Sequence, residues 1–244
     1  MAAALGEFFI IDELQAAVSE RVARITGAEA ATVTHCTAAA ITLAIAATMT
    51  GDSETGIARL PDTTGMPNRV IIPAGHVVNY GHSILTAIRL AGAVPVIAGT
   101  ESDCTVDDIS HALVGEHTAC LLLVSSRLAH GTPLDLGQAV AAAHACGLPA
   151  VIDGAAQDLR LDELLATGAD LVLVSAQKYL AAPTAGLIVG RRDVVRACRA
   201  HEHGIGRGMK ATKESIAGVL AALEEREHLD VAIILRRLAV LSEA

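Results

Sequence analysis

Short apolar runs alternate with amphipathic stretches along most of the chain. The apolar runs are rich in Val, Ile and Leu and lie between turn residues, a pattern typical of buried strands. Seven are expected: AATVT, which ends at Thr34, and residues 69–74, 94–99, 118–126, 148–154, 170–176 and 185–190. The last two flank the connection that carries Lys178.

The stretches between these runs have helical periodicity. Helices are expected over residues 11–27, 37–51, 79–93, 105–114, 133–147, 192–204 and 213–227. Gly27 is the predicted C-cap of the first helix and Thr105 the predicted N-cap of the fourth, while Pro133 is predicted to begin the fifth. Residues 52–68 carry turn residues every few positions and are predicted to be loop.

Strands that alternate with helices predict an α/β protein with a doubly wound, mostly parallel sheet of about seven strands. Helices on both faces of such a sheet make an α/β/α sandwich, and its strands are buried on both sides. In open sheets of this kind, ligands bind beyond the carboxyl ends of the strands. The candidate chemistry is therefore expected at those ends.

Composition supports this fold class and narrows the environment. Hydrophobic residues make up 52% of the 244 residues and aromatic residues only 2%, so the core is expected to consist of Ala, Val, Leu and Ile. The net charge of −9 disfavours a nucleic-acid partner. The five cysteines are scattered without CxxC spacing, which predicts free thiols in a reducing compartment and no metal site.

The start of the sequence is not expected to be a secretory signal or a membrane anchor. The first residues lack a basic n-region, and no apolar stretch is long enough to predict a membrane span. The expected location is the cytoplasm.

Polar residues follow the predicted strands at a few places: His35 to Thr37, Asp153, Ser175 and Lys178. Asp153 ends a strand too apolar for an unpaired carboxylate, so it needs a cationic partner or a helix N-terminus. A lysine at the edge of the core loses hydration and its pKa falls, which makes the amine a nucleophile toward carbonyls. The alternatives are an aspartate that caps the next turn and a lysine that extends to solvent.

The spacing of Asp153 and Lys178 favours a joint role. They are one α/β unit apart, so they are expected on neighbouring strands at one edge of the sheet. An acid for the ring nitrogen and a lysine for a Schiff base are the two groups that pyridoxal 5′-phosphate (PLP) requires of a protein. Ser175 and the small residues from Thr34 to Ala38, which enter a helix, form a predicted phosphate site.

The chain resembles the selenocysteine synthase-like branch of the fold-type I PLP enzymes, which includes the L-seryl-tRNA(Sec) selenium transferase and D-glucosaminate-6-phosphate ammonia-lyase groups. The resemblance lies in segments that span most of residues 13–225, above all "GADLVLVSAQKYLAAPTAGLIVGRRDVV" and "GIGRGMKATKE". It implies that Lys178 is the Schiff-base lysine and that Asp153 pairs with the pyridine nitrogen. It also implies that Ala155 packs behind the ring.

The resemblance further implies the remaining contacts of the site. Cys36, Thr37, Ala38 and Ser175 would hold the phosphate. His76 would lie over the front of the ring, with Tyr80 close behind it. Substrate contacts are expected from Ser126, His130 and Arg207.

The expected function is a PLP-dependent lyase or transferase. It would abstract the α-proton of an amino-acid-like or amino-sugar-acid substrate and then eliminate or replace a β-substituent. The alternatives are a catalytically incomplete PLP-binding or dimerising relative, and an α/β protein in which Lys178 binds a phosphosugar or nucleotide.

Two domains and a homodimer are also expected. Residues 1–210 form the predicted PLP-binding domain, and residues 211–244 a helical segment that starts a shortened small domain. The N-terminal arm and the C-terminal small domain usual in the family are not found in this sequence, a departure that favours the incomplete relative. A homodimer or a larger homo-oligomer is expected, because sites in this fold are generally completed across a subunit interface.

Overall fold

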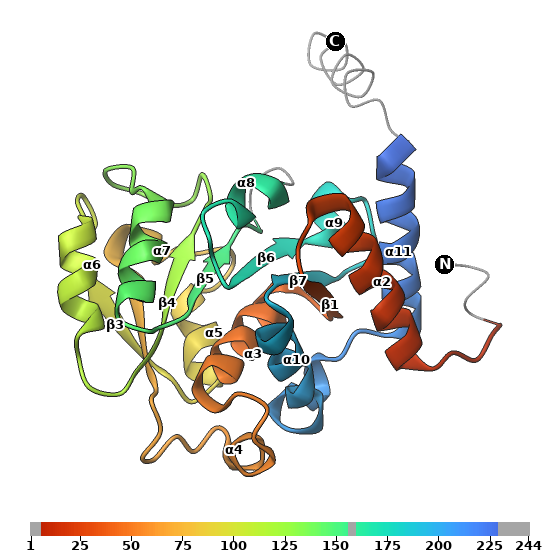
Figure 1. The fold of residues 1–244 in the computed structure, drawn as a ribbon, viewed down its shortest axis with the longest axis horizontal. Coiled ribbons are helices and arrows are strands. Elements are labelled where there is room, and N and C mark those ends of the chain that lie inside the picture. Colours follow the sequence, from red (N-terminus) through yellow and green to blue (C-terminus); the bar gives the residue numbers. More distant parts are fainter. Residues whose placement is uncertain (1–5, 156–159, 229–244) are drawn as a thin grey trace, which may run out of the picture.

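A computed structural model describes residues 6–155 and 160–228, and these residues form one seven-stranded sheet between two layers of helices (Figure 1). The strands are β1 (Ala30–Thr34), β2 (Arg69–Pro73), β3 (Val94–Ala98), β4 (Thr118–Val124), β5 (Ala150–Asp153), β6 (Leu171–Ser175) and β7 (Gly186–Gly190). Their order across the sheet is β1-β7-β6-β5-β4-β2-β3. The prediction of an α/β fold with about seven strands is confirmed.

The sheet is mixed but mostly parallel. Strands β3, β2, β4, β5 and β6 pair with one another in parallel. Strand β7 pairs antiparallel with both β6 and β1. The reversal at β7 follows from the short connection after β6, which is too brief for the crossover that a parallel strand needs.

Helices cover both faces of the sheet. The helices are α2 (Ile11–Thr26), α3 (Thr37–Thr50), α4 (Glu54–Arg59), α5 (Ile84–Leu90), α6 (Val106–Leu113), α7 (Leu136–Ala145), α8 (Leu161–Leu165), α9 (Ala176–Tyr179), α10 (Arg192–Ala200) and α11 (Lys213–His228). The 3₁₀ helices in the described part of the chain are η1 (Ala74–His76), η2 (His201–His203) and η3 (Ile205–Met209). One core cluster joins α2, α6, α7, α8 and α11 to the sheet, and the other joins α3, α5 and α10.

The central strands supply both clusters by alternation. In β4, Leu121 and Leu123 belong to one cluster, while Cys120 and Leu122 belong to the other. Successive side chains of a strand point to opposite faces, so a continuous apolar run is what a strand covered on both sides requires. Because aromatic residues are nearly absent, aliphatic side chains fill the core on both faces of the sheet, as expected.

Several helix boundaries differ from the prediction. Residues 52–68 are not all loop, because Ser53 accepts a hydrogen bond from the Gly56 N–H and begins α4. Ser83 caps α5, so the expected helix over 79–93 starts late. The expected helix from Pro133 begins after Asp135, whose carboxylate accepts from the Gln138 N–H. The prediction missed α8, which is only five residues long.

Helix α2 closes the outer edge of β1 with side chains in place of a strand. The Gln15 side-chain amide donates to the Val33 carbonyl at 2.9 Å and accepts from the Val33 N–H at 2.8 Å. The Ser19 hydroxyl accepts from the Ala31 N–H at 2.9 Å. Because unpaired groups at a sheet edge invite association, these bonds protect the strand that leads into α3.

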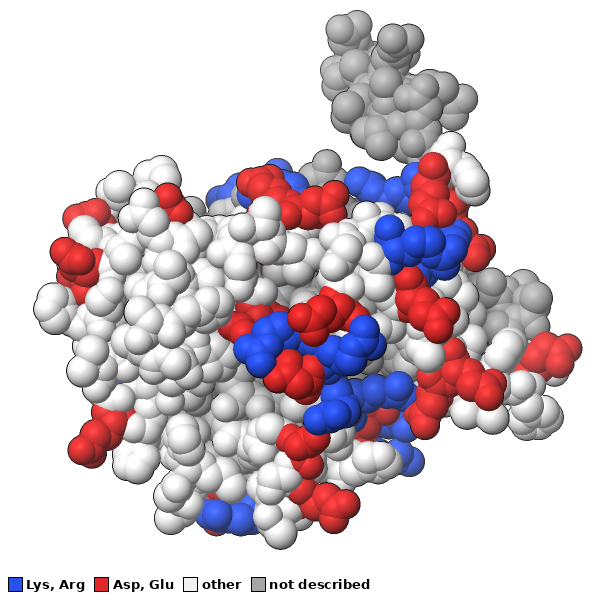
Figure 2. Space-filling view, viewed as in Figure 1, with Lys and Arg blue, Asp and Glu red and all other residues white. Residues whose placement is uncertain are grey.

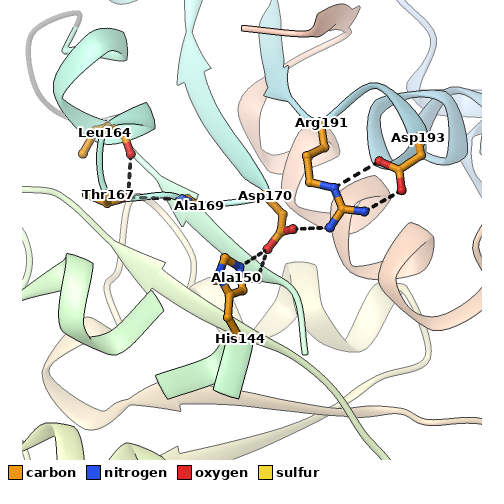
Figure 3. A network of polar contacts seen from close by, with 8 residues as sticks. All are labelled: His144, Ala150, Leu164, Thr167, Ala169, Asp170, Arg191 and Asp193. Atoms are coloured by element: carbon orange, nitrogen blue, oxygen red, sulfur yellow. Dashed lines mark hydrogen bonds and ion pairs between the residues drawn. The ribbon is translucent and has the colours of Figure 1, made fainter. Parts of the chain in front are cut away.

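Asp170 joins the ends of three strands at the opposite edge from the predicted site (Figure 3). Its carboxylate is 3% exposed and accepts from the Ala150 N–H at 2.8 Å, from His144 Nε2 at 2.8 Å and from Arg191 Nη1 at 2.6 Å. The three bonds connect the start of β5, the end of α7 and the residue after β7. They fix the relative positions of strands whose other ends carry the candidate chemistry.

Candidate active site

A cavity of about 240 Å³ lies at the carboxyl edge of the sheet, where ligands were predicted to bind. It collects side chains that follow β1, β2, β4, β5 and β6. Its walls are Cys36, Thr37, Ala38, Ile41, Val78, Tyr80, Val124, Ser126, Leu128, Asp153, Ala155, Ser175, Gln177, Lys178 and Ala185. Asp153, Ala155, Ser175, Lys178 and the three phosphate-turn residues from Cys36 to Ala38 are thus brought together, as expected from the sequence.

Asp153 is the last residue of β5 and is only 5% exposed. Burial raises the pKa of its carboxyl group to about 6, against the opposing effects of a hydrogen bond from the Ala155 N–H and of the Lys178 charge. The Ala155 N–H donates to Oδ1 at 2.9 Å. Such a carboxylate is ready to accept a further proton or hydrogen bond from a group in the cavity.

Lys178 lies in α9, the single helical turn that follows β6. Strands β5 and β6 are parallel neighbours, so the predicted adjacency of Asp153 and Lys178 is confirmed. The expected desolvation of the lysine is not found, because the residue is exposed although it lines the cavity. It takes part in none of the ion pairs found among the described residues, so its amine is free for a ligand.

The turn between β1 and α3 presents unused N–H groups to the cavity. Cys36 is the N-cap of α3 in an extended conformation, and its thiol makes no capping bond. The first backbone bond of the helix is from the Ala40 N–H to the Cys36 carbonyl at 3.0 Å. The N–H groups of Thr37, Ala38 and Ala39 therefore have no partner within the helix.

The same turn is suited to an anion. Helix α3 has no acidic residue in its first turn, so no carboxylate of that turn competes with a ligand anion for its positive N-terminal dipole. Ser175 ends β6 on the same cavity wall, and its hydroxyl makes no capping bond to α9. Two hydroxyls and a row of N–H groups are therefore available to a phosphate.

Tyr80 is the aromatic side chain of the cavity. Its hydroxyl is buried and has no hydrogen-bond partner among the residues that the structure describes. Burial raises the pKa of the phenol, and the nearby Asp153 and Cys36 raise it further. The ring meets His82 edge-on at 4.7 Å between ring centroids, which holds its orientation. A buried hydroxyl without a partner is costly, so this atom indicates a ligand contact.

Three predicted contact residues lie elsewhere. His76 is 7% exposed and accepts from the Val124 N–H at 3.0 Å, which makes it part of the scaffold behind the cavity wall. Burial lowers the pKa of His76 to about 4. His130 lies with His76 in a separate, smaller cavity, and Arg207 is exposed in η3. Among the substrate candidates, Ser126 lines the main cavity.

The sequence reasoning missed several lining residues. Gln177 was not predicted as a lining residue. Its position directly before Lys178 is the signal that could have indicated this role. Leu128 lies within the segment around Ser126. Val78 and Ala185 follow and precede strands, but apolar residues at such places carry no distinguishing signal.

A larger hollow of about 710 Å³ lies at the opposite edge of the sheet, and its lining includes Asp170 and Arg191, whose polar contacts are drawn in Figure 3. Every charged side chain that lines it is already paired, including Arg196 with Asp52 at 2.8 Å. On the side of the molecule drawn in Figure 2, positive and negative side chains lie interleaved near the middle rather than one sign gathered alone. The main cavity, the one lined by Asp153 and Lys178, has unpaired polar groups and is the better candidate for chemistry.

The residues of the main cavity fit PLP. A buried carboxylate suits the pyridinium nitrogen, a free amine suits the aldehyde, and the start of α3 with Ser175 suits the phosphate. Ala155 leaves room for a flat ring. Within residues 6–155 and 160–228, no helix is long and apolar enough to cross a membrane.

The fold is that of the fold-type I PLP-dependent enzymes. The PLP-dependent protein YhfS from Escherichia coli superposes with a TM-score of 0.62 over 86% of this chain at 18% identity, which shows the shared fold. More particularly, residues 12–242 match the family described as SelA, L-seryl-tRNA selenium transferase, and the chain belongs to this family. The expected resemblance is confirmed.

Curated relatives match nearly the whole chain. The D-glucosaminate-6-phosphate ammonia lyase of Salmonella typhimurium is 38% identical over all of this chain and 66% of its own length. The 5′-C-glycyluridine monooxygenase-decarboxylase of a Streptomyces species is 37% identical over 88% of this chain and 54% of its own length. A solved structure of a D-glucosaminate-6-phosphate ammonia-lyase superposes with a TM-score of 0.90, covering 94% of this chain and 62% of that one. The chain therefore spans about half to two thirds of the length of these relatives.

Proposed function

We propose that this protein binds PLP covalently through Lys178 and acts on an amino-acid-like or amino-sugar-acid substrate as a lyase or transferase. The observation that carries the proposal is the single cavity that holds an unpaired lysine amine, a buried carboxylate on the adjacent strand and the free N-terminus of α3. The similarity to an ammonia lyase supports elimination as the reaction class.

Each residue has a part in this proposal. The N–H groups of Thr37 and Ala38, with the Ser175 hydroxyl, hold the phosphate beside Cys36, and the Asp153 carboxylate holds a proton on the ring nitrogen. Tyr80 takes the place over the ring that the sequence assigned to His76. PLP supplies an electron-accepting ring that stabilises negative charge at the substrate α-carbon. The Lys178 amine then accepts the α-proton at Nζ, and a β-substituent leaves or is replaced.

The test is spectroscopic. Purified protein incubated with PLP is expected to show a visible absorption band near ~420 nm that borohydride removes, with reduction fixing the label on the peptide that contains Lys178. Lys178→Ala should show no band, while Lys213→Ala, which removes a lysine outside the cavity, should keep it. Adding amino acids and amino sugar acids should then shift the band for the true substrate. A colourless protein under these conditions contradicts the proposal.

One observation favours the second candidate, a PLP-binding relative without turnover. Among the described lining residues, Lys178 is the only basic side chain, so those walls offer no second cation for a substrate carboxylate. For the protein to be an active enzyme, we propose that a second copy of the chain supplies this cation in a homodimer. A PLP band that no amino acid perturbs, in a protein that is monomeric by light scattering, would favour the non-catalytic candidate.

A further inference from the structure

Residues 201–210, here called the strap, run beside α3 from its last residue to the turn before its first. At one end, His201 Nε2 lies 2.9 Å from the Thr50 hydroxyl, at the C-terminus of α3. At the other end, the Met209 carbonyl accepts from the His35 N–H at 2.9 Å. A helix of 14 residues is about 21 Å long, so the strap contacts both ends of the helix that carries the anion site.

The backbone of the strap packs closely against α3 and α4. A Cβ atom on Gly206 would lie 2.6 Å from Leu43 Cδ2 in α3 and 2.7 Å from the His201 carbonyl oxygen. A Cβ atom on Gly204 would lie 2.7 Å from Ile57 Cγ2 in α4. A side chain at either position would force the neighbouring atoms to shift, so the glycines let the strap lie close to α3 at Gly206 and to α4 at Gly204.

An ion pair closes the strap on itself. Lys210 Nζ lies 3.7 Å from Glu202 Oε2, and the Glu202 side chain is only 12% exposed. Lys210 also forms an antiparallel bridge with Thr34, and the Thr34 hydroxyl donates to the Cys36 carbonyl at 3.0 Å. The pair thus acts on the backbone that enters the phosphate turn, from outside the cavity.

We propose that Glu202 and Lys210 are positioning residues that set the affinity of the α3 N-terminus for the cofactor phosphate. Their pairing holds the strap at the length at which Met209 and Lys210 fix Thr34 and His35. Without the pair, the backbone of this turn is no longer held in position. The N–H groups of Thr37 and Ala38 then no longer point together toward the phosphate. This inference rests on the proposed function of the cavity.

The test compares pyridoxal 5′-phosphate with pyridoxal, which lacks the phosphate. Glu202→Gln and Lys210→Met should weaken pyridoxal 5′-phosphate binding about three- to tenfold in absorption titrations, with pyridoxal binding unchanged. Inorganic phosphate should likewise compete less well in both variants. Lys210→Arg, which keeps the pair, should restore the wild-type ratio. Glu224→Gln is the matched control. It removes the charge by which Glu224 of α11 pairs with Arg21 of α2, and it should leave the binding of both aldehydes unchanged.

The outcomes separate the two proposals. Wild-type protein that binds neither aldehyde overturns the proposed function itself. Wild-type protein that prefers the phosphorylated form, with variants that keep the same preference or lose both affinities equally, overturns the role of the strap. Thermal melting shows whether each variant is folded. Because Glu202→Gln and Lys210→Met both remove the ion pair, either one that is folded suffices for the comparison.

Discussion

Lys178 and Asp153 reach one cavity from adjacent parallel strands, and the positive charge of the lysine offsets part of the rise that burial imposes on the pKa of the aspartate. No ion pair joins the two side chains, although both are described by the structure. The protein therefore keeps a buried carboxylate and an exposed amine apart. Such an arrangement is costly unless a ligand lies between them.

Asp153→Asn should stabilise the cofactor-free protein while weakening cofactor binding. The folded pKa of Asp153 is raised from 3.8 to about 6, so the folded state favours the proton and the charge costs stability above pH 6. The gain should be about 1–3 kcal/mol at pH 8 and should vanish toward pH 4, because the wild-type carboxyl is protonated there. Urea unfolding at both pH values measures it. Equal stability of the two proteins at pH 8 would show that the carboxylate is not strained.

Tyr80→Phe tests whether the buried hydroxyl serves a ligand. Removal of a hydroxyl without a partner should leave the cofactor-free protein as stable as before, or more stable by about 1 kcal/mol. PLP binding should weaken about five- to tenfold if the hydroxyl contacts the bound group. Tyr80→Ala, which also removes the ring, should weaken it more. The contact is excluded if Tyr80→Phe binds PLP as the wild type does.

His76 should make the protein sensitive to acid. Its pKa falls from 6.5 to about 4 on folding, so the unfolded state binds the proton first and stability declines as the pH falls from about 6.5 to about 4. His76→Asn keeps an acceptor for the Val124 N–H but does not titrate. In an Asp153→Asn background, which removes the opposing titration, it should flatten the decline by about 1–3 kcal/mol. Urea unfolding between pH 4 and 8 tests this, and an unchanged slope would count against the assignment.

The sequence predicted what depends on local pattern. The apolar runs predicted the seven strands of the described sheet, and Thr105 is the N-cap of its helix as predicted, with a reciprocal bond to Asp108 in addition. Asp153, Ser175 and Lys178 were found because polar residues after apolar strands are conspicuous. The start of α7 was misplaced because Pro133 looked like a first helical residue, whereas Asp135 provides the capping carboxylate.

What the sequence could not give are relationships between distant segments. His76 and Tyr80 are both polar aromatic residues after the same strand, and only the path of the chain decides which one enters the cavity. The exposure of Lys178 depends in the same way on the turn of α9. The strap contacts its helix through glycines, whose role appears only when the neighbouring atoms are placed.

Gln15→Ala should destabilise the protein although it lies outside the cavity. The side chain is 1% exposed and satisfies both the N–H and the carbonyl of Val33, which the substitution would leave without partners. The expected loss is about 2–4 kcal/mol in urea unfolding. Gln138→Ala, which removes an exposed amide bonded to Asp135, is the matched control and should change stability by less than about 0.5 kcal/mol. Similar losses in both variants would mean that the edge of β1 does not depend on Gln15.

Gly186→Ala should displace the phosphate turn from the side of β7. An added Cβ atom would lie 2.6 Å from the carbonyl carbon and oxygen of Cys36 and from the Thr34 hydroxyl, so the turn must move away. We expect a stability loss of about 1–3 kcal/mol and weaker binding of PLP relative to pyridoxal. Gly137→Ala adds the same methyl group in α7, where the nearest atom is 3.4 Å away, and should be neutral or slightly stabilising. If Gly186→Ala binds both compounds like the wild type, the phosphate is held elsewhere than on the turn at Cys36.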